Sequence, residues 1–384
     1  MFDFDTVINR RDSDSTKWRK YDEDVLPLWV ADMDFASPPA IASALQERVA
    51  HGVFGYPDPQ ASLVQTLVMA MQRDYNWQIQ PDWLVPLPGL VVGLNVACRA
   101  TGSNDDPVLT ATPVYPPFMS APILSQRRLV RVPMLEAEGS DGTRWAWDID
   151  QLVGSLGPGN NTLMLCHPHN PVGRVWRTEE LLQLAAVAQR HDMVVVSDEI
   201  HCDLILDAGH KHVPFAALSP DAAQRSITLM APSKTYNVPG LGCSFAIIPN
   251  PALRKKFTDV MRGIVPHVNI FGYVACEAAY RDGVPWRTAL LDVLRRNRDL
   301  VMQQLDGYLG LRVTRPEATY LAWVDCRNTG IEDPAAFFEA AGVGLSNGVD
   351  FGLKGFVRLN FGCALSTLQD ALHRMREALA NRTS

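Results

Sequence analysis

The sequence predicts an α/β protein with a large domain, built on a mostly parallel central sheet flanked by helices, and a smaller α+β domain. Two observations carry this prediction: short apolar runs alternate with helical segments between residues 107 and 248, and the pattern changes after residue 284. Most of the runs are continuously apolar rather than alternating. Strands covered on both faces have this pattern, which is typical of parallel sheets with helices on either side.

Five runs are predicted to be strands of the central sheet, at 107–112, 162–166, 193–197, 226–230 and 243–248. Between the second and third runs, a helix is expected from Thr178 to about His191. Thr178 suits the N-cap position, and the two glutamates that follow it favour the positive end of the helix dipole. Leucine and alanine side chains then share one face, as expected for a helix that packs on a sheet.

The C-terminal part has a mixed pattern. A long helix is expected at 285–305, where Pro285 can occupy the first turn and apolar residues recur on one face. The elements expected after it are a strand at 319–324, a short helix at 334–341, a strand at 356–361 and a closing helix from Ser366. A chain of 384 residues is too long for one compact core to be the default. We therefore predict a large domain at 46–280 and a small domain that combines 1–45 with 281–384.

Composition favours a small-molecule partner in the cytoplasm. The net charge is −7 and the basic residues are scattered, so neither nucleic acid nor a membrane surface is indicated as a partner. No stretch approaches the ~18 apolar residues that a membrane span needs, and no secretory signal is visible. The seven cysteines form no C-x-x-C pair and lie mostly in apolar runs, which is typical of reduced thiols in a cytoplasmic protein.

Polar side chains follow four of the predicted strands. In chain order they are Tyr115, Asn170, Asp198, and the pair Ser233 and Lys234. Ligands of an open parallel sheet bind outside the carboxyl ends of its strands, so we expect these side chains to converge at one edge. The sequence therefore predicts a binding site that combines an aromatic ring, an amide, a carboxylate, a hydroxyl and an amine.

This set of side chains fits pyridoxal phosphate. The amine of Lys234 can form a Schiff base with the cofactor's aldehyde, provided that it is partly buried and can lose its proton. Asp198 can keep the ring nitrogen protonated, and a protonated ring is the electron sink that stabilises a carbanion at the substrate α-carbon. Tyr115 can stack on the ring, and Asn170 can bind the phenolic oxygen.

The phosphate group needs a cradle, and residues 88–93 offer one. This stretch is a turn that leads into an apolar helical segment, so Gly89, Leu90 and Val91 can present free backbone N–H groups to an anion. Ser233 can add its hydroxyl.

Several stretches, taken together, resemble a known family. They are WVADMDF at 29–35, GYP at 55–57, PGLVV at 88–92, TPVY at 112–115, HNPVGRVW at 169–176, SDEIHCD at 197–203, APSKTYN at 231–237 and FVRLN at 356–360. The chain resembles fold-type I pyridoxal-phosphate enzymes, and more narrowly the cystathionine β-lyase (C-S lyase, MalY/PatB-type) group of the aminotransferase-like family. The stretches span nearly the whole chain in family order.

The resemblance implies a role for each matching residue. Lys234 holds the cofactor and shuttles the α-proton, while Asp198, Asn170 and Tyr115 hold its ring as described above. His201 stands where many aminotransferases have a tyrosine that touches the phenolic oxygen. Tyr56 matches a tyrosine that reaches the phosphate in the neighbouring subunit, which implies an obligatory homodimer.

The resemblance also implies a substrate site. Arg358 matches the arginine that binds the substrate α-carboxylate through a bidentate pair. Ala31 and Asp32 are expected over the substrate, with Trp29 walling the pocket. One departure concerns the position eight residues after the lysine, where aminotransferases commonly have a phosphate-binding arginine and this chain has Gly242.

A second departure is His167-Pro-His169-Asn-Pro, where the family commonly has Asn-Pro-x-Asn-Pro. His167 and His169 share a face on a strand, as do His210 and His212, yet neither pair has a third ligand at a recognisable spacing. We therefore predict no metal site.

The reaction implied is α,β-elimination from L-cystathionine or a related sulfur amino acid, which gives pyruvate, ammonia and a thiol. An aminotransferase would use the same residues, so the sequence leaves that alternative open. A regulator that binds the cofactor without turnover is a third possibility.

Overall fold

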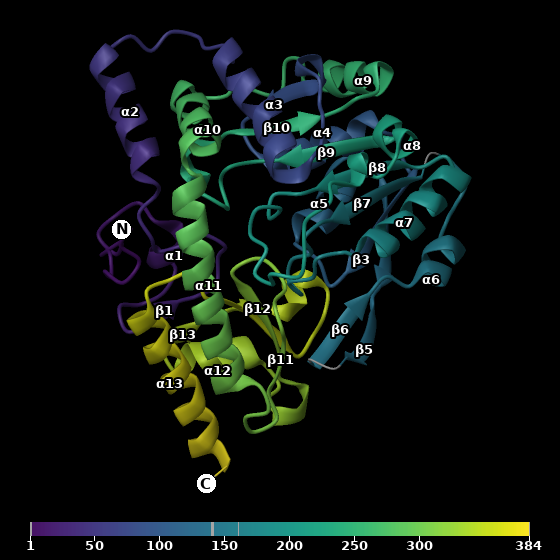
Figure 1. The fold of residues 1–384 in the computed structure, drawn as a ribbon. Coiled ribbons are helices and arrows are strands. Elements are labelled where there is room, and N and C mark those ends of the chain that lie inside the picture. The colour runs from purple at the N-terminus through teal and green to yellow at the C-terminus, as the bar shows by residue number, and fades with distance from the viewer. Residues whose placement is uncertain (1, 140–141, 160, 384) are drawn as a thin grey trace.

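The computed structural model describes residues 2–139, 142–159 and 161–383 (Figure 1). Among these residues, the large sheet has seven strands in the order β2-β10-β9-β8-β7-β3-β4. Their bounds are β2 (Leu84–Leu87), β10 (Ser244–Ile247), β9 (Ser226–Met230), β8 (Val194–Asp198), β7 (Thr162–Cys166), β3 (Pro107–Thr112) and β4 (Arg128–Pro133). Neighbours from β9 to β4 are parallel, and β10 is antiparallel to both β9 and β2. The predicted mostly parallel sheet is confirmed.

The five predicted runs became central strands because both of their faces are buried. Val108 and Met164 belong to the hydrophobic core on one face of the sheet, whereas Leu109 and Leu163 belong to the core on the other. Helices that contribute to the first core are α4 (Leu90–Ala100), α5 (Pro117–Leu124) and α9 (Pro251–Met261). Those that contribute to the second are α6 (Ile149–Gly154), α7 (Thr178–Arg190) and α8 (Pro220–Gln224).

The sequence did not predict the two outermost strands, β2 and β4. β2 has only four residues and contains Pro86, which is tolerated at a sheet edge. β4 contains two arginines and is largely exposed, so its sequence lacks the continuous apolar run of a covered strand.

The predicted N-cap of α7 is wrong by one residue. Arg177 is the N-cap, with extended backbone angles, and Thr178 is the first helical residue. The backbone N–H of Arg177 donates to the Glu180 carboxylate at 2.8 Å. A glutamate side chain in the first turn, rather than a threonine hydroxyl, therefore makes the side-chain hydrogen bond at the start of α7.

The C-terminal part confirms the predicted mixture of helices and strands. Its antiparallel sheet has the order β11-β12-β15-β14, with β11 (Arg312–Thr314), β12 (Leu321–Asp325), β15 (Phe356–Asn360) and β14 (Ser346–Asn347). Its helices are α12 (Pro334–Ala340) and α13 (Leu365–Thr383). The short strands β1 (Leu26–Pro27) and β13 (Val343–Gly344) pair in parallel and join the N-terminal segment to this part. A separate hairpin joins β5 (Leu135–Gly139) to β6 (Gly142–Ala146).

A row of long helices links the two sheets. Figure 1 shows α10 and α11 following one another from the large sheet down to the small one, with α2 and α3 beside α10 at the top. The bounds are α2 (Pro39–His51), α3 (Ala61–Tyr75), α10 (Ile270–Asp282) and α11 (Val284–Leu305). Ala275 and Ala279 of α10 belong to the hydrophobic core that also contains the small sheet. The predicted boundaries of the two domains stay a prediction. No helix formed by the described residues is long and apolar enough to cross a membrane.

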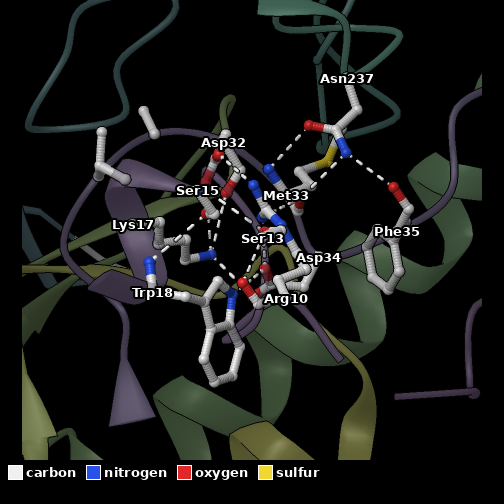
Figure 2. A network of polar contacts seen from close by, with 12 residues as sticks. Arg10, Ser13, Ser15, Lys17, Trp18, Asp32, Met33, Asp34, Phe35 and Asn237 are labelled. Carbon is white, nitrogen blue, oxygen red and sulfur yellow. Dashed lines mark hydrogen bonds and ion pairs between the residues drawn. The ribbon is translucent and has the colours of Figure 1, made fainter. Parts of the chain in front are cut away.

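Buried ion pairs tie the N-terminal segment to the middle of the molecule (Figure 2). Lys17, at the start of α1 (Thr16–Arg19), has a fully buried side chain whose Nζ lies 2.8 Å from Asp34 Oδ2. Arg10 bridges Asp32 and Asp34 at 2.9 and 2.7 Å. The indole N–H of Trp18 donates to Asp34 at 2.8 Å. Two cations and an indole thus converge on two carboxylates.

We expect Lys17→Met to lower the free energy of unfolding by about 3 kcal/mol, because it removes one partner of a buried ion pair. Burial favours a higher pKa for Asp34, but Lys17, Trp18 and Arg10 hold that pKa below its usual value. The stabilisation is therefore present above the unfolded-state pKa and is lost as pH falls through the folded-state pKa. Urea denaturation at pH 7 measures the effect. The control, Lys255→Met, removes an exposed ion pair and should change little; equal losses in both variants would contradict the expectation.

Candidate active site

A cavity of about 290 Å³ opens at the carboxyl ends of β3, β7, β8 and β9. The sequence-predicted residues that line it are Ala31, Gly89, Leu90, Val91, Tyr115, Asn170, Asp198, His201, Ser233, Lys234 and Arg358. The structure therefore brings together the side chains that follow four separate strands, as expected from the topology of a parallel sheet.

Lys234 lies in a tight turn after β9. The turn is closed by a backbone hydrogen bond from Val238 to Ser233 at 3.0 Å. The Lys234 amine donates to the backbone carbonyl of Ala31 at 2.6 Å. Burial, and then the positive charge of Arg358, lower the pKa of Lys234 to about 8. An amine of this kind can lose its proton near neutral pH, which a nucleophile and base requires.

Asp198 ends β8 as a buried carboxylate. Burial raises its pKa to about 7, while a hydrogen bond from the backbone N–H of Ile200, at 3.1 Å, favours the charged form. The neighbouring Glu199 adds to the rise, and Lys234 opposes it. A cationic group placed beside Asp198 would therefore restore its negative charge.

Arg358 stands on β15 and reaches across to the large sheet. Its Nη1 donates to the Asn170 amide oxygen at 3.1 Å, and its Nη2 donates to the Trp29 carbonyl at 2.8 Å. The guanidinium also lies 4.7 Å over the ring of Phe351. Among the described residues, Nε has no hydrogen-bond partner. Burial lowers the pKa of Arg358 to about 10, so an anion in the cavity would relieve the cost of its buried charge.

Tyr115 and His201 also line the cavity. Tyr115 is partly buried, and its backbone N–H donates to the Asn170 carbonyl at 3.0 Å. His201 is buried with its ring edge-on to Tyr320, and its Nδ1 has no hydrogen-bond partner among the described residues. Burial, followed by the charges of Lys234 and Arg358, lowers the pKa of His201 to about 3. The imidazole is therefore neutral at physiological pH.

The predicted phosphate cradle lies at the start of α4. Gly89 is the N-cap, so the N–H groups of Leu90 and Val91 belong to the first turn, where no intrahelical partner exists. Ser233 and Gly242 line the same cavity. Gly242 has a φ of +57°, and a Cβ there would lie 3.2 Å from the Pro88 carbonyl, which disfavours the arginine that the family commonly has at this position.

Three predicted residues do not line the cavity. The Trp29 ring faces the N-terminal segment, where its N–H donates to the Lys17 carbonyl and the Lys20 amine lies 4.2 Å over it. Asp32 pairs with Arg10, although its charge acts on Lys234. Tyr56 lies in the segment between α2 and α3 and is fully exposed. Their predicted roles stay predictions.

Sequence reasoning missed residues that hold the site from outside. Ser346 donates to the Trp29 carbonyl at 2.7 Å, and Tyr320 donates to the Ala31 carbonyl at 2.9 Å. Asn237, three residues after the lysine, bonds the backbone of residues 33 and 35. Asn237 falls within a quoted motif and could have been found there, whereas Ser346 carries no local signal.

The histidine pairs have other partners. His169 bonds the Pro113 carbonyl at 2.8 Å, and His212 bonds Glu199 at 2.6 Å while its ring stacks on His167. Within the described ranges, no group of three histidine, cysteine, aspartate or glutamate side chains could hold a metal ion.

The cavity has the groups that pyridoxal phosphate requires. Lys234 offers an amine that can be neutral, and Asp198 a buried carboxylate able to face a cationic ring nitrogen. The first turn of α4 offers N–H groups for the phosphate. The buried Arg358 could then bind the carboxylate of an amino acid. The residues present therefore fit the cofactor.

Comparisons with known proteins agree with this geometry. The model of the aminotransferase class I and II family matches residues 23–375. The chain is 39% identical to cystathionine beta-lyase PatB of Bacillus subtilis (strain 168), an alignment that covers 98% of this chain and 100% of PatB.

Solved structures are similar over the same length. The crystal structure of OvoB is 49% identical with a TM-score of 0.95, covering 98% of this chain and 99% of that one. Cystalysin from Treponema denticola, whose crystal structure contains pyridoxal 5'-phosphate, is 32% identical with a TM-score of 0.92, covering 100% of both chains. The resemblance identified from the motifs is confirmed. The chain belongs to the aminotransferase class I and II family.

Proposed function

We propose that the chain is a pyridoxal-phosphate enzyme that catalyses α,β-elimination on L-cystathionine or a related sulfur amino acid. The observation that carries the proposal is the cavity in which the side chains of Lys234, Asp198 and Arg358 meet. The similarity to a cystathionine beta-lyase over the full chain supports the choice of reaction. Elimination breaks a Cα–H and a Cβ–S bond, consumes water and gives a thiol, pyruvate and ammonia.

Each side chain has a task that follows from its position. Arg358 binds the substrate carboxylate with its guanidinium fork, and Asn170 keeps that fork in place. Lys234 takes the α-proton once its amine is free, a step for which its lowered pKa is suited. Asp198 keeps its charge opposite the ring nitrogen. The bound cofactor supplies the sink for the electrons of the broken bond.

Supplying L-cystathionine without any keto acid tests the reaction type. Sustained release of pyruvate and thiol is the expected result, because an elimination needs no amino acceptor. Turnover that starts only after a keto acid is added would overturn the proposal in favour of an aminotransferase. Lys234→Ala is the control, and it should lose both the turnover and the visible absorbance that arises from the covalent bond between lysine and cofactor.

We expect Arg358→Lys to lower kcat/KM by about 10- to 100-fold, mainly through KM, because a lysine cannot form the bidentate pair with a carboxylate. Steady-state kinetics on the same substrate measure this. Arg327→Lys is the matched control, since Arg327 also lies 4.7 Å over a phenylalanine ring but stands outside the cavity. A loss in Arg327→Lys of the same size would argue against the assigned role.

We propose further that the active form is a homodimer in which Tyr56 reaches the cofactor phosphate of the neighbouring subunit. The complete exposure of Tyr56 in one chain, together with the exposed Val53 and Phe54 beside it, supports this. A cytoplasmic location is proposed as well, supported by seven free, buried cysteines.

Subunit complementation tests the role of Tyr56. Tyr56→Ala and Lys234→Ala chains are each expected to have low activity. When they are co-expressed, one site of the mixed dimer combines an intact Lys234 with an intact Tyr56 from the other chain. Activity should then exceed the sum of the parents. A mixture no more active than its parents would mean that Tyr56 acts within its own chain or not at all.

A further inference from the structure

Residues 29–35 cross beside the cavity without forming a strand, and side chains bind most of their carbonyl oxygens. The donors come from distant parts of the chain. They are Arg358 and Ser346 on Trp29, Asn360 on Val30 and Asp32, Lys234 and Tyr320 on Ala31, Lys17 on Asp32, Arg10 on Met33, and Asn237 on Met33 and Phe35. The position of the Ala31 carbonyl, which binds Lys234, is thus set by this group of donors.

Asn237 connects this segment to the lysine turn through three side-chain hydrogen bonds. Its amide oxygen accepts from the Met33 N–H at 2.9 Å, and its amide nitrogen donates to the Met33 and Phe35 carbonyls at 2.9 and 2.7 Å (Figure 2). Asn237 has a φ of 55°, a left-handed conformation that asparagine adopts more readily than most residues. One side chain therefore uses both ends of its amide to clamp the segment.

We propose that Asn237 is a positioning residue for Lys234: it holds residues 31–35 so that the Ala31 carbonyl binds the lysine amine whenever that amine is free. The proposal rests on the proposed function, in which Lys234 takes a proton from the substrate.

Hydrogen bonds from other parts of the chain to residues 31–35 support the same role. Arg10 donates to the Met33 carbonyl at 3.2 Å, so Met33 is held from the N-terminal segment and from the lysine turn at once. Tyr320 approaches the Ala31 carbonyl from the small sheet. A hydrogen bond to a charged amine is about twice as strong as a neutral one, so the carbonyl can keep the protonated Lys234 in one place.

Two variants remove the clamp in different ways. Asn237→Asp keeps the left-handed conformation and the acceptor for Met33 N–H, but it turns the donor into an oxygen that faces two carbonyls. Asn237→Gly tolerates the positive φ and loses all three side-chain hydrogen bonds. The matched controls are Asn76→Asp and Asn76→Gly, because Asn76 is also left-handed, with a φ of 51°, and caps α3 away from the cavity.

The first measurement needs no turnover. Trace acetylation of the cofactor-free full chain, read by mass spectrometry, compares Lys234 with the exposed Lys255 in the same molecule. The ratio of the two rates should rise by about tenfold in both Asn237 variants, the factor that one hydrogen bond to a charged group is worth. It should not change in the Asn76 controls. An unchanged ratio in the Asn237 variants would overturn the proposal.

The second measurement uses the cofactor-loaded enzyme and substrate deuterated at the α-carbon. In the Asn237 variants kcat should fall by at least about tenfold with little change in KM, and the isotope effect on kcat should increase, because a misplaced amine slows proton transfer. A fall in kcat with an unchanged isotope effect would assign Asn237 a merely structural role. Absence of elimination in the unaltered enzyme would refute the proposed function alone, and the acetylation ratio would then decide on Asn237.

Discussion

The structure depends on the hydrogen bonds made to the backbone of residues 29–35, because this segment lies between the N-terminal region, the two sheets and the cavity. A buried carbonyl oxygen without a donor costs free energy, and the segment lacks the continuous ladder that a strand would provide. Side chains from four regions supply the donors instead. Each of these hydrogen bonds fixes the segment against one part of the fold. The carbonyl beside Lys234 is therefore placed by the whole molecule rather than by its local sequence.

Burial has a common effect on the three charged groups of the cavity. It raises the pKa of Asp198 to about 7 and lowers the pKa of Lys234 and Arg358 to about 8 and 10. In each case the charged form is disfavoured because water is excluded. A ligand that brings a cation to Asp198 and an anion to Arg358 would offset these costs together. The cavity thus favours a ligand with charges in that arrangement over a neutral ligand or one whose two charges are exchanged.

The sequence predicted those parts of the fold whose burial leaves a local pattern. Covered strands such as β3 and β7 are continuously apolar, and residues at their carboxyl ends meet because parallel strands point the same way. The edge strand β4 was missed because most of its residues are exposed or half-buried, so its sequence contains no continuous apolar run. The hydrogen bonds of Asn237 join residues about 200 positions apart, so no periodicity could reveal them. Likewise, the exposure of Tyr56 depends on the folded surface around it.

Arg358 connects the small sheet to the cavity at the edge of the large one. It stands on the small sheet, yet its guanidinium donates to Asn170, which follows β7 of the large sheet, and to the Trp29 carbonyl. In the proposed function, Arg358 binds the substrate carboxylate away from the Cα–H bond that breaks, so the binding energy can be used to orient that bond toward Lys234. This works only if the distance between Arg358 and Lys234 is fixed, and both residues bond to carbonyls of the same short segment, at residues 29 and 31. In the proposed function, the segment therefore couples the binding of the substrate carboxylate to the position of the base.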